Sequence, residues 1–180
     1  IGVFENKIVK LYDLYKHNDI SKSELSKQVN SILKKEEGRF NGLFHKDFCL
    51  DEQNLLKQIT SNLISKIART SQIEKQRGKL PEGDLQKNIE TAFRSGFYMH
   101  FRDVMNYNGS RYKISLPKKV ANYYFIREFC YGSMFRFNKS GHFNIPYGGI
   151  GYNSKDFRGK VDYIFSSEVK NLLKDTTIKN

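Results

Sequence analysis

The chain is most distinctive between Tyr123 and Tyr152, where it reads YYFIREFCYGSMFRFNKSGHFNIPYGGIGY. Residues 130–137 are mostly apolar or aromatic, residues 138–141 have the composition of a turn, and residues 142–145 return. Gly141 stands where such a turn tolerates a positive φ, so the pattern predicts a β-hairpin. A hairpin with Arg, Asn and Lys near its tip can enter the major groove of DNA, where arginine bonds guanine and asparagine bonds adenine.

Most of the remaining sequence predicts α-helices. Apolar residues recur at helical spacing near residues 8–15, 21–33, 51–67, 84–104 and 117–129. We expect loops at 35–48, 106–110 and 148–154, another helix near 160–173 and the start of a strand at 176–180. Too few buried strands are predicted for a doubly wound α/β sheet. The expected fold class is therefore mainly α, a helical domain with an attached β-hairpin.

Two of the predicted helices begin with capping residues. Ser21 and Glu24 have the spacing of a capping box. Asp51 and Glu52 are acidic residues where the dipole of the next helix favours negative charge. This interpretation is preferred over a catalytic pair of carboxylates.

The charge of the chain favours a nucleic-acid partner. Its 180 residues carry a formal net charge of +12, and neutralising phosphates releases counterions. Lysines that only solvate helix faces are an equally good explanation of this charge. We expect no membrane partner, because no apolar run is long enough to cross a bilayer and the first residues do not form a secretory signal.

The cysteines and histidines give little sign of special chemistry. Cys49 and Cys130 are too few for a disulfide framework, so we expect buried thiols in a reducing cytoplasm. The four histidines lack the spacing of metal ligands, and we expect no metal.

The distinctive stretch also resembles a known family. Its pattern is similar to FNGLYRxNxxGxFNxPxG of the Dam-like adenine-specific DNA methyltransferases. The matching residues are Tyr131, Met134, Phe135, Arg136, Asn138, Gly141, Phe143, Asn144, Pro146 and Gly148. Gly132-Ser133 departs from the Asn-Gly pair of the family, which lies beside the extruded base.

The two ends of the chain extend this resemblance. Residues 5–16, ENKIVKLYDLYK, resemble the family's segment after its second strand, although Val3 stands where the family has an acid that meets the cofactor ribose. Residues 170–180 resemble the stretch before the strand with the catalytic motif.

Neither the Gly-rich turn that admits S-adenosylmethionine nor an Asp-Pro-Pro-Tyr motif occurs in the 180 residues. The run at residues 148–151 follows the hairpin, and we expect it to be a loop.

The resemblance, with the start at Ile1 rather than Met, implies an excised middle piece of an α/β methyltransferase. Residues 1–19 would be a remnant helix of the cofactor-binding domain and 20–129 a helical target-recognition region. Residues 130–154 would be the DNA-reading hairpin and loop, and 155–180 the return to the catalytic domain. The parent enzyme would transfer a methyl group from S-adenosylmethionine to the exocyclic amine of adenine in duplex DNA, in a bacterial or phage restriction–modification system. The piece alone is expected to be inactive, without catalytic residues or bound cofactor.

Nine residues are the candidates for DNA binding. They are Arg136, Asn138, Lys139, Tyr131, Gly132, Asn144, Pro146, Lys155 and Arg158. Arg136 is the first choice for reading a base, because a guanidinium matches the two acceptors of guanine. The alternative for Arg136 is a salt bridge with an acid such as Glu128.

The other candidates also have alternatives. Asn138 either bonds a base or caps its own turn, and Tyr131 is either a wedge beside an extruded base or a half-buried strand aromatic. Asn144 and Pro146 are expected to shape the returning strand. The basic candidates contact phosphates or are solvated charges, and Arg111 and Lys113 extend the same face.

Two further functions stay open on the sequence alone. One is a basic helical module that binds nucleic acid without enzymatic activity. The other is a protein-interaction domain whose lysines only solvate its surface.

Overall fold

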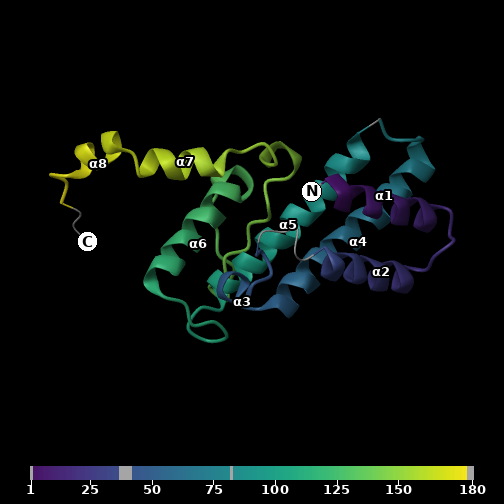
Figure 1. Ribbon diagram of the computed structural model, residues 1–180, viewed down its shortest axis with the longest axis horizontal. Helices are drawn as coiled ribbons and strands as arrows, with labels where there is room; N and C mark the ends of the chain where they lie inside the picture. The colour runs from purple at the N-terminus through teal and green to yellow at the C-terminus, as the bar shows by residue number, and fades with distance from the viewer. Residues whose placement is uncertain (1, 37–41, 82, 178–180) are drawn as a thin grey trace.

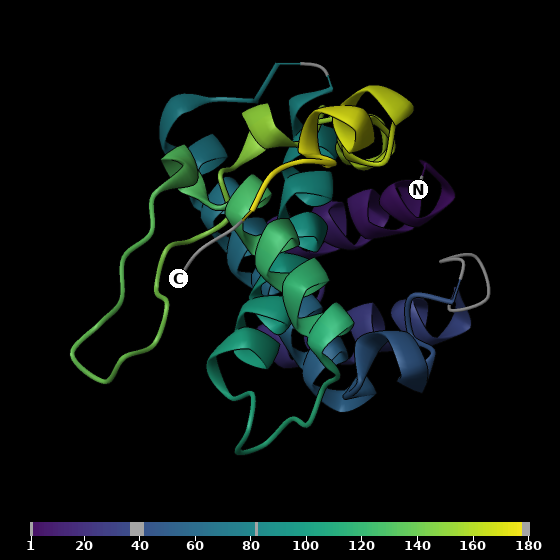
Figure 2. The ribbon, with the colours of Figure 1, turned by 90° about the vertical axis from the view of Figure 1, so that its left-hand side faces the viewer.

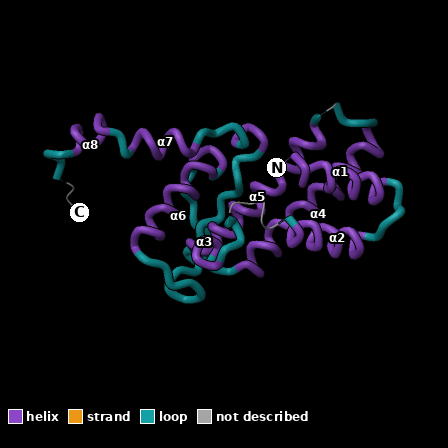
Figure 3. Tube along the Cα trace, viewed as in Figure 1, coloured by secondary structure: helices purple, strands orange, loops and turns teal. Residues whose placement is uncertain are grey.

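The computed structural model describes residues 2–36, 42–81 and 83–177. Within these residues the chain forms α-helices, two short 3₁₀ helices and no sheet, which confirms the mainly α fold class (Figures 1 and 3). The helices are α1 (Gly2–Lys16), α2 (Lys22–Lys35), α3 (Lys46–Cys49), α4 (Glu52–Arg77), α5 (Asp84–Asn106), α6 (Leu116–Phe129), α7 (Phe157–Ile164) and α8 (Ser167–Leu173). The 3₁₀ helices are η2 (Tyr131–Ser133) and η3 (Ile150–Tyr152).

Four helices form the body of the molecule. Residues of α1, α2, α4 and α5 share one hydrophobic cluster, in which Leu25, Val29 and Leu33 form the buried stripe of α2. The predicted helix starts are confirmed: Ser21 Oγ accepts the N–H of Glu24, as the capping box requires of its serine, and Asp51, expected only as an acid at a helix start, also accepts the N–H of Asn54 through Oδ1. These bonds satisfy backbone donors that a helix start leaves open, which fixes where α2 and α4 begin.

A glycine lets the two longest helices approach closely. A Cβ atom at Gly96 of α5 would lie 2.4 Å from the Cα of Ile59 in α4. Only a residue without a side chain fits this crossing. The position of α5 against α4 therefore depends on Gly96.

The C-terminal half of α5 carries a second hydrophobic cluster. Tyr98 of α5 packs there with Ile126 and Phe129 of α6 and with residues that follow α6. Cys130 belongs to this cluster and Cys49 to the first, and both are buried free thiols, as expected. Thus α5 joins the helical body to the part of the chain that contains the predicted hairpin.

Several predicted elements differ from the structure. The loop expected at 35–48 contains α3, residues 37–41 of it lying outside the described part, and the loop expected at 148–154 contains η3. The helix expected at 160–173 is two helices, because the backbone of Ser166 is extended (φ −65°, ψ 157°) and its side chain caps α8 by accepting the N–H of Val169. Thr176 and Thr177 form no strand, and residues 178–180 lie outside the described part.

Helices α7 and α8 extend from the rest of the molecule as an arm (Figure 1). Their apolar side chains are exposed at Tyr163, Phe165, Leu172 and Leu173. Among the described residues, no helix is both long and apolar enough to cross a membrane.

Candidate nucleic-acid interface

Residues 130–148, here called the hairpin loop, run out from α6 and back as a projecting loop (Figure 2). Two isolated antiparallel bridges join its sides, Cys130 with Tyr147 and Phe137 with Phe143. The N–H of Asn144 also donates to the carbonyl of Arg136 at 3.2 Å. The chain thus follows the path of a hairpin, as predicted. The expectation of regular β-strands was wrong, because the two sides are joined by isolated bridges. The 3₁₀ turn η2 interrupts the outgoing side.

Both bends of the hairpin loop depend on residues with positive φ. Gly132 has φ 62° and Ser133 has φ 50°, and the N–H of Met134 donates to the carbonyl of Tyr131 at 3.3 Å. A turn with two such central residues is also the turn that Asn-Gly favours. The Gly132-Ser133 pair therefore suits the same backbone geometry as the Asn-Gly of the resembled pattern. At the tip, Gly141 has φ 74° and closes the predicted turn.

Helix α5 holds the returning side of the hairpin loop. The side chain of Asn106 donates to the carbonyl of Phe143 at 3.0 Å and accepts the N–H of Phe143 at 2.8 Å. The hydroxyl of Tyr98 donates to the carbonyl of Ile145 at 3.0 Å. Phe143, Ile145 and Tyr147 alternate into the second cluster, so side chains of α5 and buried aromatics together replace the neighbouring strand that a sheet would supply.

Arg136 is oriented by a neighbour across the hairpin loop. Its Nε donates to Oδ1 of Asn144 at 3.2 Å. This bond leaves the two terminal Nη groups of the guanidinium as donors, and they lie on an exposed residue. Among the described residues Arg136 forms no ion pair with an acid, and Glu128, the acid named as an example, is bound by Lys155 at 3.2 Å and by Lys160 at 2.5 Å. Burial alone would raise the pKa of Glu128, but the bonds from these lysines lower it.

The remaining candidates divide into outward-facing and internally bonded residues. Lys139 and Pro146 are exposed, and Tyr131 is 56% exposed beside the first bend. By contrast, Oδ1 of Asn138 accepts the N–H groups of Ser140 and His142, so its amide oxygen serves the turn. This bonding is the turn-capping alternative, and it leaves only the NH₂ group of Asn138 for a ligand.

Two basic candidates behave differently from each other. Lys155 donates to the carbonyl of Glu128 at 2.6 Å and lies 4.0 Å from the ring centre of Tyr152. The ammonium of Lys155 is therefore used to fasten the chain after η3 to α6. Arg158 of α7 is 87% exposed and contacts only Asp162 of the same helix, among the described residues.

Exposed aromatic side chains continue from the hairpin loop onto α6. Tyr123 packs on Phe135, which packs in turn on Phe143, at ring-centre distances of 5.1 Å and 4.9 Å. Tyr123 and Phe137 are 47% and 55% exposed. Aromatic rings beside an arginine offer stacking surfaces to nucleic-acid bases.

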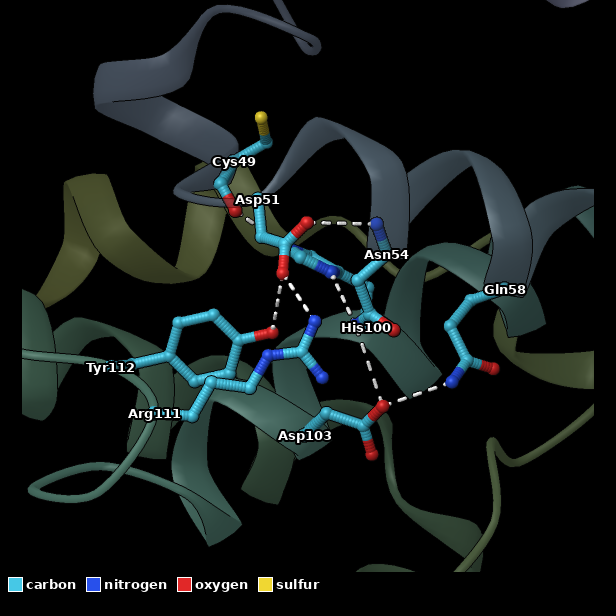
Figure 4. Close-up of polar contacts among 8 residues, drawn as sticks. All are labelled: Cys49, Asp51, Asn54, Gln58, His100, Asp103, Arg111 and Tyr112. Atoms are coloured by element: carbon cyan, nitrogen blue, oxygen red, sulfur yellow. Dashed lines mark hydrogen bonds and ion pairs between the residues drawn. The ribbon is translucent and has the colours of Figure 1, made fainter.

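A polar cluster supports the loop between α5 and α6, which lies next to the hairpin tip. Asp51 at the start of α4 binds Arg111 and Tyr112 of this loop as well as the N–H of Asn54 (Figure 4). Burial would raise the pKa of Asp51, but the bonds from Asn54 and Arg111 lower it. Tyr107 of the same loop packs edge-on against His142, at 4.9 Å between ring centres. Arg111 is therefore exposed but paired with Asp51. Lys113, two residues later in the same loop, is exposed.

The glycine run at residues 148–151 begins with a glycine that packs closely within the chain. A Cβ at Gly148 would lie 2.4 Å from the ring of Tyr152, so this glycine packs against an aromatic ring of its own chain. Within the described ranges, no group of three or more His, Cys, Asp or Glu side chains is placed to hold a metal ion.

Comparison with known proteins finds a similarity for part of the chain. Over 61 residues, 34% of the chain, the sequence is 38% identical to type II methyltransferase M.MjaIII of Methanocaldococcus jannaschii. Over 60 residues, 33% of the chain, it is 39% identical to type II methyltransferase M.CviBI of Paramecium bursaria Chlorella virus NC1A. One third of this chain is similar to type II methyltransferases. The similarity supports a relationship between the matched third of the chain and a methyltransferase family.

The extent of the similarity is limited. Each matched segment spans 20% of the relative, so the chain covers about a fifth of the length of these methyltransferases. No protein-family model and no solved structure matches the chain.

The sequence-based prediction missed the residues that support the hairpin loop. Asn106, Tyr98 and the hydroxyl of Tyr152, which accepts the N–H of Gly132 at 3.0 Å, were not among the candidates. A signal was present on α5: Tyr98, Arg102 and Asn106 are hydrogen-bonding residues spaced by four, and therefore lie along one side of the helix. Arg102 Nη1 also donates to the carbonyl of Ile145, at 3.4 Å.

Proposed function

We propose that the chain is the DNA sequence-recognition part of a Dam-like, S-adenosylmethionine-dependent, adenine-specific DNA methyltransferase. The similarity to type II methyltransferases supports the methyltransferase part of this proposal. The projecting hairpin loop and the net charge of +12 support contact with duplex DNA. In this proposal residues 20–129 carry the hairpin loop, and residues 1–19 and 155–180 lead to the cofactor-binding and catalytic parts.

The observation that carries the proposal is the orientation of Arg136. A guanidinium that enters the major groove must present two donors in a fixed direction to bond O6 and N7 of guanine. The bond from Nε to Asn144 restrains the guanidinium and leaves the Nη pair as donors on an exposed residue. Pre-orientation of this kind reduces the side-chain entropy that binding would otherwise cost.

The rest of the hairpin loop has supporting tasks in this proposal. Tyr131, on the exposed first bend, is the wedge that fills the space left by an extruded adenine. Lys139 at the tip and Arg158 on α7 contact phosphates. The chain itself contributes recognition, while methyl transfer belongs to residues outside it.

The test is binding to a panel of short duplexes of varied sequence, with Arg136→Ala and Arg136→Lys. We expect Arg136→Ala to lose about 1–3 kcal/mol of discrimination, roughly 5- to 150-fold, at one base pair. Arg136→Lys keeps the charge but cannot present a planar pair of donors, so it should lose most of the same discrimination.

Arg158→Ala is the matched control, because it removes the same charge from an exposed residue outside the hairpin loop. It should lower the affinity for all duplexes by a similar factor. If Arg136→Ala behaves like Arg158→Ala, the chain is a basic nucleic-acid-binding module and the recognition role is excluded.

A further inference from the structure

A groove separates α2 from α4 on the helical body, away from the elements that form the hairpin loop. It encloses about 590 Å³. Its walls carry three lysines, four hydroxyl side chains, two amides and two apolar side chains, and no carboxylate among the described residues. Such a lining presents many hydrogen-bond donors and positive charge to a ligand, which is the chemistry that phosphate groups require.

The groove lysines differ from other lysines of the same body. Lys7 pairs with Glu36, and Lys16 pairs with Glu74. Lys22, Lys34 and Lys57 are exposed and form no ion pair with any residue of the described ranges. Three positive charges are thus collected around one groove without neutralisation from the described part of the chain.

The groove is elongated and its walls are joined. Lys22, Ser26, Asn30 and Lys34 recur every four residues along α2 and form one edge about 18 Å long at 1.5 Å per residue. The hydroxyl of Thr60 in α4 donates to Oδ1 of Asn30 at 2.6 Å. This bond ties the walls together and keeps the NH₂ group of Asn30 as a donor. An edge of this length corresponds to about five base-pair steps along the axis of duplex DNA, at 3.4 Å per step.

We infer that this groove binds the phosphodiester backbone of nucleic acid, at a site separate from the hairpin loop. Its lysines supply charge, its hydroxyls and amides supply hydrogen bonds, and none of them reads a base. The inference builds on the proposed function, since it gives a DNA-recognition chain a second, sequence-independent contact. An isolated small anion would not engage Lys22 and Lys34, at the two ends of the α2 edge, together with Lys57 of α4.

The test compares two triple variants with equal loss of charge. Lys22→Gln/Lys34→Gln/Lys57→Gln removes the groove charges, and Lys10→Gln/Lys75→Gln/Lys170→Gln removes three exposed charges outside the groove. Affinity for a long duplex of arbitrary sequence is measured against salt concentration. The groove variant should reduce the slope of log affinity against log salt by about 2.7, which makes the affinity loss between about 50 and 200 mM salt roughly 40-fold smaller.

The two variants decide the inference. It is overturned if the groove variant leaves the slope unchanged, or if the control variant lowers it equally, since charge alone would then explain binding. Lys22→Arg/Lys34→Arg/Lys57→Arg should retain the slope, and its loss would also contradict a phosphate site.

The result is separable from that of the proposed function. If Arg136→Ala abolishes sequence preference and the groove variant changes nothing, only the groove site fails. If the groove variant lowers the slope and no sequence preference exists, the recognition role fails and the phosphate site stands.

Discussion

His100 is fully buried, and both of its ring nitrogens bond to protein groups (Figure 4). Nε2 lies 2.6 Å from the carbonyl oxygen of Cys49, so it must carry a proton and donate. Nδ1 lies 3.1 Å from Nδ2 of Asn54 and therefore accepts a hydrogen bond from that amide. Only the neutral ring satisfies both contacts. Burial lowers the pKa of His100 below 6.5, although the bond to Cys49 opposes this.

The lowered pKa of His100 makes stability depend on pH. As pH falls below 6.5, the histidine of the unfolded chain binds a proton before that of the folded chain. The contribution of His100 to the free energy of unfolding is therefore greatest above pH 6.5. It decreases as pH falls from 6.5 to the pKa of the folded state, by at most about 1.4 kcal/mol per pH unit. Urea unfolding between pH 7.5 and 5 measures this. His100→Gln should flatten the dependence, whereas substitution of exposed His17 by Asn should keep it. A pH dependence that survives in His100→Gln would assign it to other groups.

At the scale of elements, Asn106 replaces a missing strand. Its side chain bonds both backbone groups of Phe143, from a helix that is 37 residues away in sequence. Asn106→Ala removes two hydrogen bonds, so we expect a loss of about 1–3 kcal/mol, concentrated in the hairpin loop. Hydrogen exchange should show reduced protection of the Phe143 and Asn144 amides while the amides of α4 stay protected. Asn88→Ala on the same helix is the control, and equal effects of the two variants would contradict this role for Asn106.

Local sequence patterns predict some elements of the fold and miss others. The spacing of Leu25, Val29 and Leu33 and the caps at Ser21 and Asp51 are local, and α2 and α4 form as predicted. Helix α3 has four residues, too few for a periodic pattern, and the break at Phe165 follows no Gly or Pro. Arg136 was predicted as the base-reading residue because a guanidinium matches the two acceptors of guanine. Its partner Asn144, and the anchor at Asn106, depend on how distant segments pack, which periodicity does not encode.

At the scale of the whole molecule, α5 is the element common to both hydrophobic clusters. Ile89, Ala92 and Phe93 belong to the cluster of the helical body, and Tyr98 belongs to the cluster beneath the hairpin loop. Gly96 lies between these two groups of residues, at a close approach to α4. A displacement of α5 at this point must therefore reach both clusters.

Gly96→Ala tests this coupling. Alanine favours a helix over glycine by about 1 kcal/mol, so a purely local effect would stabilise the protein. The added Cβ instead meets backbone atoms of Gln58 and Ile59 at 2.4–2.8 Å, and backbone cannot move aside without shifting a helix. We expect a net loss of about 1–3 kcal/mol, with faster hydrogen exchange in both clusters. Gln86→Ala, at an exposed position of α5, should be close to neutral. Faster exchange confined to one cluster would show that α5 does not couple them, and the hairpin loop would then be supported independently of the helical body.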